Sequence, residues 1–551
     1  MHCLRLFFIC LIFSSLQFSL NAQALSFESQ STVLAKLGYS SLEKAKTAYD
    51  FFITSIAQKK FTSDEYKKCS KLYKKNLCQF LRDYHAKNSK KKSGSGRAYS
   101  KKHRIQLSNT QLIQKENYTQ LLRRFPDKKE SDLNLYYTQA LKTKSCPRNF
   151  SLVLAYEFED FSEKAGTRKQ IEKLYDHGLS CVKKTDEWSE FTHLRAGNFA
   201  KLRNDLDGAI KLYKKALQAN RKREDYRALH MLRKIYMTQN KTEKAEKISQ
   251  QIMQQFPRSW YAIHAYKDKN QDIFSIYSSR ASISDSYQSP NPILDYMGYW
   301  MKFAFHVDTV FERKKKLATK FIRLFNKDTD LGYTLHMARR FDINSFYLHQ
   351  ISILTRVFSK NPTKINRDVL TLLHPYPHEK AFSSLSPEID TAIILGLSRQ
   401  ESSFDKNARS RANARGLMQI LPSTAKRVDP TRYKHLYNPL NNIKIGYSFL
   451  NSLIERYEGS IEKALGAYNA GPHKMDKWQK MFSWVNDFES FLDLIPYRET
   501  RDYVPSILRN AYWYHRLYPE KLNKNKKDYK SAFLLRRHFP VMSNRMPSSL
   551  R

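Results

Sequence analysis

Glycine and acidic residues are both scarce in this chain of 551 residues, which has 15 glycines and only 52 Asp and Glu. The sequence also lacks convincing runs of alternating polar and apolar residues, the pattern typical of β-strands. From Leu25 onward, apolar residues recur with helical spacing, so we predict an all-α protein. Because 41% of the residues are hydrophobic and 13% aromatic, the chain can bury a large core, divides into more than one domain and is not disordered.

The shortage of acidic residues leaves a strongly basic chain. Against the 52 acidic residues stand 96 Lys and Arg, a formal net charge of +44. Such a charge suits any polyanion: nucleic acid, anionic lipid, or the acidic polymers of a bacterial envelope. Charge alone does not choose among these partners.

Long hydrophobic runs are also lacking, apart from one at the start of the chain. Residues 1–24 have a basic start, an apolar run from Leu6 to about Phe18, and an A-x-A cleavage signal at Ala22–Ala24, which predicts a secretory signal peptide. An uncleaved membrane anchor is the alternative, but polar residues break the run. We therefore expect a periplasmic or secreted protein of net charge +43, with no transmembrane segment after cleavage and no nucleic-acid partner.

Cysteine is infrequent, and no C-x-x-C or H-x-x-x-H cluster accompanies it, so we expect no metal site. Four of the six cysteines lie after the signal peptide, and disulfides are expected in an oxidising compartment. Sequence proximity favours Cys69 with Cys78 and Cys146 with Cys181, although buried thiols remain an alternative for the second pair.

The order of segments predicts an N-terminal α-superhelical and linker region over residues 25–375. Within it, residues 87–104 form a basic, Gly- and Ser-containing loop, either a patch for anionic polymers or a plain flexible insertion. Between about residues 108 and 266, small residues such as Gly197 recur where paired helices would meet, as in tetratricopeptide arrays. Such a helical-hairpin array serves as a scaffold or binding surface. Two prolines near residue 375 end this region, a compact region follows over 376–520, and 521–551 form a basic tail.

Glu401 is the residue that most needs an explanation. It shares one face of a predicted helix with Ile394, Leu397 and Phe404, all of them apolar. Burial disfavours the charged carboxylate and raises its pKa, which suits a general acid at neutral pH. The alternative is an exposed glutamate at a helix end, held by Arg399 or Lys406.

Five ordered blocks begin at this glutamate and follow it along the chain: "RQESSFDKNARS", "GLMQILPSTA", "NPLNNIKIGYSFL", "ALGAYNAGP" and "IPYRETRDYV". In the second block we expect the glycine to let backbone approach a ligand, and Ser423 and Thr424 to cap a new helix. Together the blocks resemble the catalytic domain of soluble lytic transglycosylases, a lysozyme-like α domain of the goose type that cuts peptidoglycan. Upstream, "WYAIHAY" at residues 260–266 is similar to the superhelical domain of the large soluble members.

The resemblance implies a role for each matching residue. Glu401 would be the sole catalytic acid and base, and no cofactor or metal is implied. The substrate-binding residues would be Met418 and Gln419 in the sugar groove, Tyr468 to orient Glu401 or the substrate, Asn469 and Ala470 at a turn, and Glu499 and Tyr503 near the muramyl residue. Asn413 departs from the family's common glycine, but asparagine also tolerates a left-handed backbone.

Only one carboxylate has a clear catalytic setting, whereas glycosidases usually employ two. We expect Asp405, four residues after Glu401, to be a structural cap. With one group, Glu401 would protonate the glycosidic oxygen and then deprotonate the C6 hydroxyl of the same muramic acid, giving a 1,6-anhydro end. The alternatives are a lysozyme-type hydrolase and a non-catalytic peptidoglycan-binding scaffold.

Overall fold

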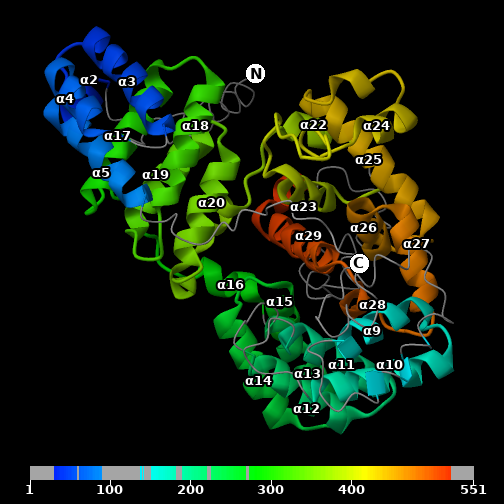
Figure 1. Cartoon of the computed structure of the whole chain (residues 1–551). Helices are drawn as coiled ribbons and strands as arrows, with labels where there is room; N and C mark the ends of the chain where they lie inside the picture. The colour runs from blue at the N-terminus through cyan, green and yellow to red at the C-terminus, as the bar shows by residue number, and fades with distance from the viewer. Residues whose placement is uncertain are drawn as a thin grey trace, which may run out of the picture. The chain divides into compact units, whose positions relative to one another are not determined.

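The structure is a computed structural model that describes residues 30–58, 61–89, 150–180, 189–219, 225–268, 272–386 and 388–522, with isolated positions between 134 and 141 (Figure 1). The signal segment, Cys146, Cys181 and most of the basic loop and tail lie outside these residues. Every regular element in the described ranges is a helix, which confirms the all-α prediction. None of these helices has the length and apolar character that crossing a bilayer requires.

The chain divides by its internal contacts into two units, and each contains two stretches of sequence. The first unit comprises residues 1–99 and 281–364, and the second comprises residues 100–280 and 365–551. The helical array and the segment with the five blocks therefore belong to the same unit.

Aromatic packing forms the core of the first unit. Trp300 is fully buried and stacks on Phe52 with ring centroids 5.0 Å apart, while Tyr49 stacks 6.0 Å from the same indole. The helices of the first unit are α2 (Gln30–Leu37), α3 (Leu42–Ala57), α4 (Ser63–Leu72), α5 (Lys75–Ser89), α17 (Pro292–Val307), α18 (Phe311–Phe321), η3 (Ile322–Leu324), α19 (Leu331–Ile343), α20 (Tyr347–Phe358) and η4 (Pro362–Lys364). These contacts join the two sequence stretches of the unit, since Phe52 lies in α3 and Trp300 in α17.

A disulfide between Cys69 and Cys78 links α4 to α5, as predicted. The expected start of the basic loop is wrong by a few residues, because α5 continues through Lys87 to Ser89. The helix therefore extends into the first three residues of this polar segment.

Helical hairpins build the first part of the second unit, in agreement with the predicted array. Its helices are α9 (Phe150–Phe158), η2 (Glu159–Phe161), α10 (Ala165–Leu179), α11 (Ser189–Leu202), α12 (Leu206–Leu217), α13 (Asp225–Thr238), α14 (Thr242–Gln255), α15 (Trp260–Lys267) and α16 (Ile273–Ser278). Successive helices pack in pairs, α9 with α10, α11 with α12, and α13 with α14. Gly197 permits one of these pairings, because a Cβ atom there would lie 2.7 Å from the ring of Tyr213.

The remaining helices of this unit contain the five blocks. They are α21 (Arg367–Leu373), α22 (Glu379–Ser383), α23 (Thr391–Ser402), α24 (Pro422–Val428), η5 (Tyr433–His435), α25 (Pro439–Arg456), α26 (Ile461–Ala470), α27 (Pro472–Met481), α28 (Phe488–Leu494), α29 (Arg498–Leu517) and α30 (Pro519–Leu522). Helix α29 packs along both α23 and α26. It therefore brings residues near position 500 to the end of α23, where Glu401 lies.

Buried ion pairs attach these helices to the array. The guanidinium of Arg195 pairs with Glu159 inside the array and also donates to the Leu494 carbonyl, 2.8 Å away, at the end of α28. Arg227 pairs with Asp493 and donates to the carbonyl of Arg501 at 2.7 Å. Arg227 also pairs with Asp502 at 3.0 Å. Both arginines are fully buried, so carboxylate partners rather than water must balance their charges.

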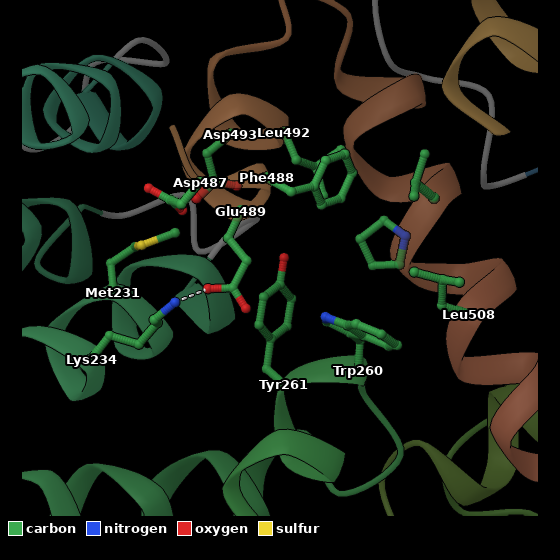
Figure 2. Close-up of a pocket in the computed structure, with 12 residues that line it drawn as sticks. Met231, Lys234, Trp260, Tyr261, Asp487, Phe488, Glu489, Leu492, Asp493 and Leu508 are labelled. Carbon is green, nitrogen blue, oxygen red and sulfur yellow. Dashed lines mark hydrogen bonds and ion pairs between the residues drawn. The ribbon is translucent and has the colours of Figure 1, made fainter. Parts of the chain in front are cut away.

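A cavity of about 110 Å³ lies where the array meets α28 and α29 (Figure 2). Trp260 and Tyr261 line it from α15, and Glu489 projects toward Lys234, with which it forms an ion pair. Its other lining residues are Met231, Asp487, Phe488, Leu492, Asp493, Val504, Pro505 and Leu508. Glu401 is absent from this lining, so the cavity is separate from the site predicted from the five blocks.

Candidate active site

Glu401 lies in the last turn of α23, a helix that is buried over most of its length. The helix begins at Asp390, whose carboxylate accepts the Ala392 N–H at 2.8 Å, and both Ile394 and Leu397 are fully buried. The placement of Phe404 on the same helical face is wrong, because the helix ends at Ser402 and Phe404 has a left-handed backbone with φ of 62°. Phe404 is still buried, but it reaches the core from the loop.

Burial raises the pKa of the Glu401 carboxyl from its ordinary value to about 7. The Tyr503 hydroxyl donates to Oε1 of Glu401 at 2.5 Å and opposes this rise, while the nearby charge of Glu499 adds to it. Burial is the largest of these effects. At neutral pH a substantial fraction of Glu401 is therefore protonated, as a general acid requires.

The loop between α23 and α24 contains residues with a left-handed backbone conformation, and their side chains form hydrogen bonds that stabilise it. Asn413 has φ of 69°, as expected for the residue that replaces the family's glycine, and its Oδ1 accepts from Arg409 Nε at 2.9 Å. Gln419 has φ of 50°, and its side-chain amide donates to the carbonyls of Ala408 and Gly416. Gln419 therefore fixes the loop through these two bonds.

Gly416 allows close packing within the protein, and the approach of its backbone to a ligand stays a prediction. Its φ is 76°, and a Cβ atom would lie 2.3 Å from both Asn442 Nδ2 and the Leu436 carbonyl. Asn442 accepts the Met418 N–H at 2.7 Å and donates to the carbonyls of Arg415 and Leu436. This buried asparagine connects the loop to α25.

Met418 and Tyr468 are joined by one hydrogen bond. The Tyr468 hydroxyl donates to the Met418 carbonyl at 2.9 Å, and burial raises the pKa of this phenol well above its usual value, with the charge of Glu401 adding to the rise. The side chain of Met418 is fully buried. It packs so closely against Gly446 that a Cβ atom at position 446 would clash with it. The Met418 side chain thus packs in the core, whereas Tyr468 lies within electrostatic range of Glu401.

Asn469 connects the end of α26 to the start of α29. Its side-chain amide donates to Glu499 Oε1 at 3.1 Å, and its Oδ1 accepts from the Thr500 hydroxyl at 2.7 Å. Ala470 is the last residue of α26, and Gly471 follows it with φ of 91°. These bonds place Glu499, which is solvent-exposed, close enough to Glu401 to affect its pKa.

Asp405 and the start of α24 complete the loop. Asp405 caps the turn through an oxygen that accepts the Asn407 N–H at 3.0 Å, and its charge is not among the causes of the Glu401 shift. The predicted hydroxyl cap of α24 is wrong, because Leu421 occupies the N-cap position and no side chain caps the helix. Pro422 starts this helix instead, since a residue without an N–H leaves one fewer donor unsatisfied.

The structure therefore brings together Glu401, Tyr468, Asn469, Glu499 and Tyr503, which come from three helices. No role was predicted for Asn442, Thr500 or Ser402. The Ser402 hydroxyl donates to the Leu417 carbonyl at 2.8 Å. Asn442 lies in the quoted block "NPLNNIKIGYSFL", so the block identified the segment but not the contact.

Family models match two segments of the chain. Residues 381–491 match the transglycosylase SLT domain, and residues 202–265 match a tetratricopeptide repeat. The soluble lytic murein transglycosylase of Salmonella typhimurium is 34% identical over 136 residues, or 23% of this chain and 21% of that protein. Membrane-bound lytic murein transglycosylase C of Haemophilus influenzae is 41% identical over 100 residues, or 15% of this chain and 28% of that protein.

Similarity to these curated relatives thus spans about a fifth to a quarter of their length. Among solved structures, the 70 kDa soluble lytic transglycosylase of Escherichia coli aligns with 82% of this chain and 78% of its own, at 16% identity and a TM-score of 0.49. Lytic transglycosylase Slt of Pseudomonas aeruginosa aligns with 94% of this chain and 91% of its own, at 17% identity and the same TM-score. The segment that contains Glu401 therefore matches the transglycosylase SLT domain and is similar in sequence to the soluble lytic murein transglycosylases.

Proposed function

We propose that this protein is a peptidoglycan lytic transglycosylase that cleaves the β-1,4 bond between N-acetylmuramic acid and N-acetylglucosamine. The observation that carries this proposal is the Glu401 carboxyl in the SLT domain, with its pKa raised to about 7 by burial and with Tyr503 bonded to it. A group with this pKa can serve as an acid and then as a base at neutral pH.

Glu401 would carry out both proton transfers. The protonated carboxyl donates its proton to the glycosidic oxygen as the bond to C1 of N-acetylmuramic acid breaks. The carboxylate then accepts the proton of the C6 hydroxyl, and the C6 oxygen bonds to C1 to close the 1,6-anhydro ring. The nucleophile belongs to the sugar itself, so its attack benefits from proximity.

The remaining predicted residues would hold the substrate around this carboxyl. Tyr503 holds Glu401 in place through its hydroxyl, and Asn469 holds Glu499, which would lie near the muramyl residue. Gln419, Tyr468 and Ala470 would contact the glycan, and Met418 would act through its backbone carbonyl, because its side chain is buried.

The proposed place of action is the periplasm or the exterior of the cell, where peptidoglycan lies. The net charge, +44 for the full chain and +43 without the signal segment, would add a long-range attraction to the anionic polymers of the envelope. This attraction is electrostatic, so binding of the protein to intact sacculi would weaken as salt is added.

A lysozyme-type hydrolase is the second candidate, and the position of Glu499 favours it. Among the described residues, Glu499 is the carboxylate whose charge acts on the pKa of Glu401. In a hydrolase, such a second carboxylate would activate water on the opposite face of the sugar. The two candidates differ in their products.

Mass spectrometry of fragments released from purified sacculi in heavy-oxygen water separates the candidates. We expect fragments that end in 1,6-anhydro-N-acetylmuramic acid and contain no label from the solvent, because the C6 oxygen is the nucleophile. Labelled reducing ends as the main product would identify a hydrolase and contradict the proposal.

The Glu499→Gln variant sharpens this experiment. If Glu499 only contacts substrate, the variant cleaves more slowly but still gives unlabelled anhydro ends. If Glu499 activates water, the labelled product disappears in the variant.

Replacing Tyr503 with phenylalanine is expected to shift the pH dependence of cleavage. The Tyr503 hydroxyl lowers the pKa of Glu401, so its loss raises that pKa further. In the wild type, kcat/KM should fall as the pH rises through about 7, and in Tyr503→Phe this fall should move to higher pH. Tyr433→Phe, on η5, is the control and should leave the profile unchanged; an unshifted profile in Tyr503→Phe would show that the hydroxyl does not act on Glu401.

A further inference from the structure

Three arginines from separate elements of the second unit lie within electrostatic range of one another, outside the Glu401 site. Arg258 lies in the turn between α14 and α15, Arg399 lies on α23, and Arg509 lies on α29. The array thus contributes one guanidinium, and the SLT-domain side of the unit contributes two.

A shared asparagine brings two of these guanidinium groups together. Arg399 Nη1 donates to Asn510 Oδ1 at 3.2 Å, and Arg509 donates to the same oxygen from Nε at 3.3 Å and from Nη2 at 3.0 Å. Arg399 Nε also donates to the Leu373 carbonyl at 2.8 Å. All of these acceptors are neutral, so none of these bonds balances the positive charges.

No carboxylate among the described residues pairs with Arg258, Arg399 or Arg509. Burial lowers the pKa of Arg399 to about 10 and that of Arg509 to about 9, and the positive charges of the neighbouring arginines add to both shifts. The pKa of Arg258 is lowered as well, mainly by burial. By contrast, the buried Arg195 and Arg227 each have a carboxylate partner.

Like charges gathered in a poorly solvated place cost free energy unless an anion balances them. A guanidinium presents its donors in a planar fork that fits the oxygens of a carboxylate or phosphate. Part of each side chain nevertheless reaches the surface, because all three arginines are half-buried rather than fully enclosed. An anion could therefore reach them.

We propose that Arg258, Arg399 and Arg509 form a binding site for an oxyanion, either a carboxylate or a phosphate group. Two residues along a helix correspond to a rotation of about 200°, so Arg399 and Glu401 lie on nearly opposite faces of α23. The anion site is therefore distinct from the catalytic carboxyl, and the inference does not depend on the proposed catalytic function.

The test is thermal unfolding of the full chain with inorganic phosphate replacing chloride at constant ionic strength. A ligand that binds only the folded state raises the Tm, and we expect a rise of about 2 °C or more at saturation. In Arg258→Gln this rise should be lost. In chloride alone, Arg258→Gln should melt at the same temperature as the wild type or higher, because one of three like charges has been removed.

Arg427→Gln is the matched control, since Arg427 is exposed and lies elsewhere on the same unit. It should retain the full response to phosphate. An equal response in the wild type and Arg258→Gln would overturn the proposal, as would a wild type whose Tm responds to neither phosphate nor acetate.

Acetate in place of phosphate distinguishes the two sources of the oxyanion. A rise in Tm with phosphate alone assigns the site to a phosphoryl group, and a rise with acetate alone assigns it to a carboxylate. A rise with both supports a general oxyanion site. In each case the response must depend on Arg258.

Discussion

The Glu401→Gln variant is expected to fold normally and to cleave peptidoglycan at least about 10³-fold more slowly than the wild type. Glutamine has almost the same shape, and it can still accept the hydrogen bond that Tyr503 donates to Oε1. Its amide can neither donate a proton to the glycosidic oxygen nor accept one from the C6 hydroxyl. The rate of release of soluble fragments from purified sacculi measures the effect.

The control for this variant is Glu520→Gln, which removes an exposed carboxylate near the end of α29 and should leave the rate unchanged. A helical circular dichroism spectrum identical to that of the wild type shows that Glu401→Gln is folded. Turnover similar to the wild type in a folded Glu401→Gln protein would exclude Glu401 from the mechanism.

Glu401→Gln is also expected to stabilise the protein at high pH. The pKa of Glu401 is raised to about 7 in the folded state, so the folded protein binds its proton more tightly than the unfolded chain does. The contribution of the group is fully present below the unfolded pKa of about 4.3 and is lost as the pH rises through about 7. At pH 8 the variant should exceed the wild type by on the order of 1–3 kcal/mol in free energy of unfolding.

Chemical denaturation of both proteins between pH 4.5 and pH 8 measures this difference. The advantage of the variant should grow as the pH rises, and Glu520→Gln should show no such trend. A difference that stays constant across this range would mean that burial does not hold the proton on Glu401.

The sequence predicted the features of the site that depend on local order. Helical spacing placed Glu401 in line with Ile394 and Leu397, and both are buried in α23. The left-handed backbone at Asn413 followed from the conformational preference of asparagine. Tyr503, one turn into α29, was named only because the block containing it resembles a known family.

Other features depend on contacts between distant segments, which spacing does not reveal. The bond from Tyr503 to Glu401 joins residues 102 positions apart, and Arg399 and Asn510 are 111 positions apart. The early end of α23 was missed because Phe404 continues the apolar spacing while its backbone leaves the helix. The cap of α24 was misassigned because Ser423 and Thr424 are common capping residues, although here Pro422 precedes both.

The buried arginines between the array and α28 limit how far the second unit can be divided. If the chain were truncated near Pro375, Asp493 would lose its ion pair with Arg227. The Leu494 carbonyl would lose its hydrogen bond from Arg195. It would also expose to water the apolar side chains that line the cavity beside α28. The SLT domain can be recognised as a sequence module, but its helices depend on the array for part of their interior. A segment that is recognised by its sequence as one module therefore need not fold by itself, and in this chain it shares part of its core with the array.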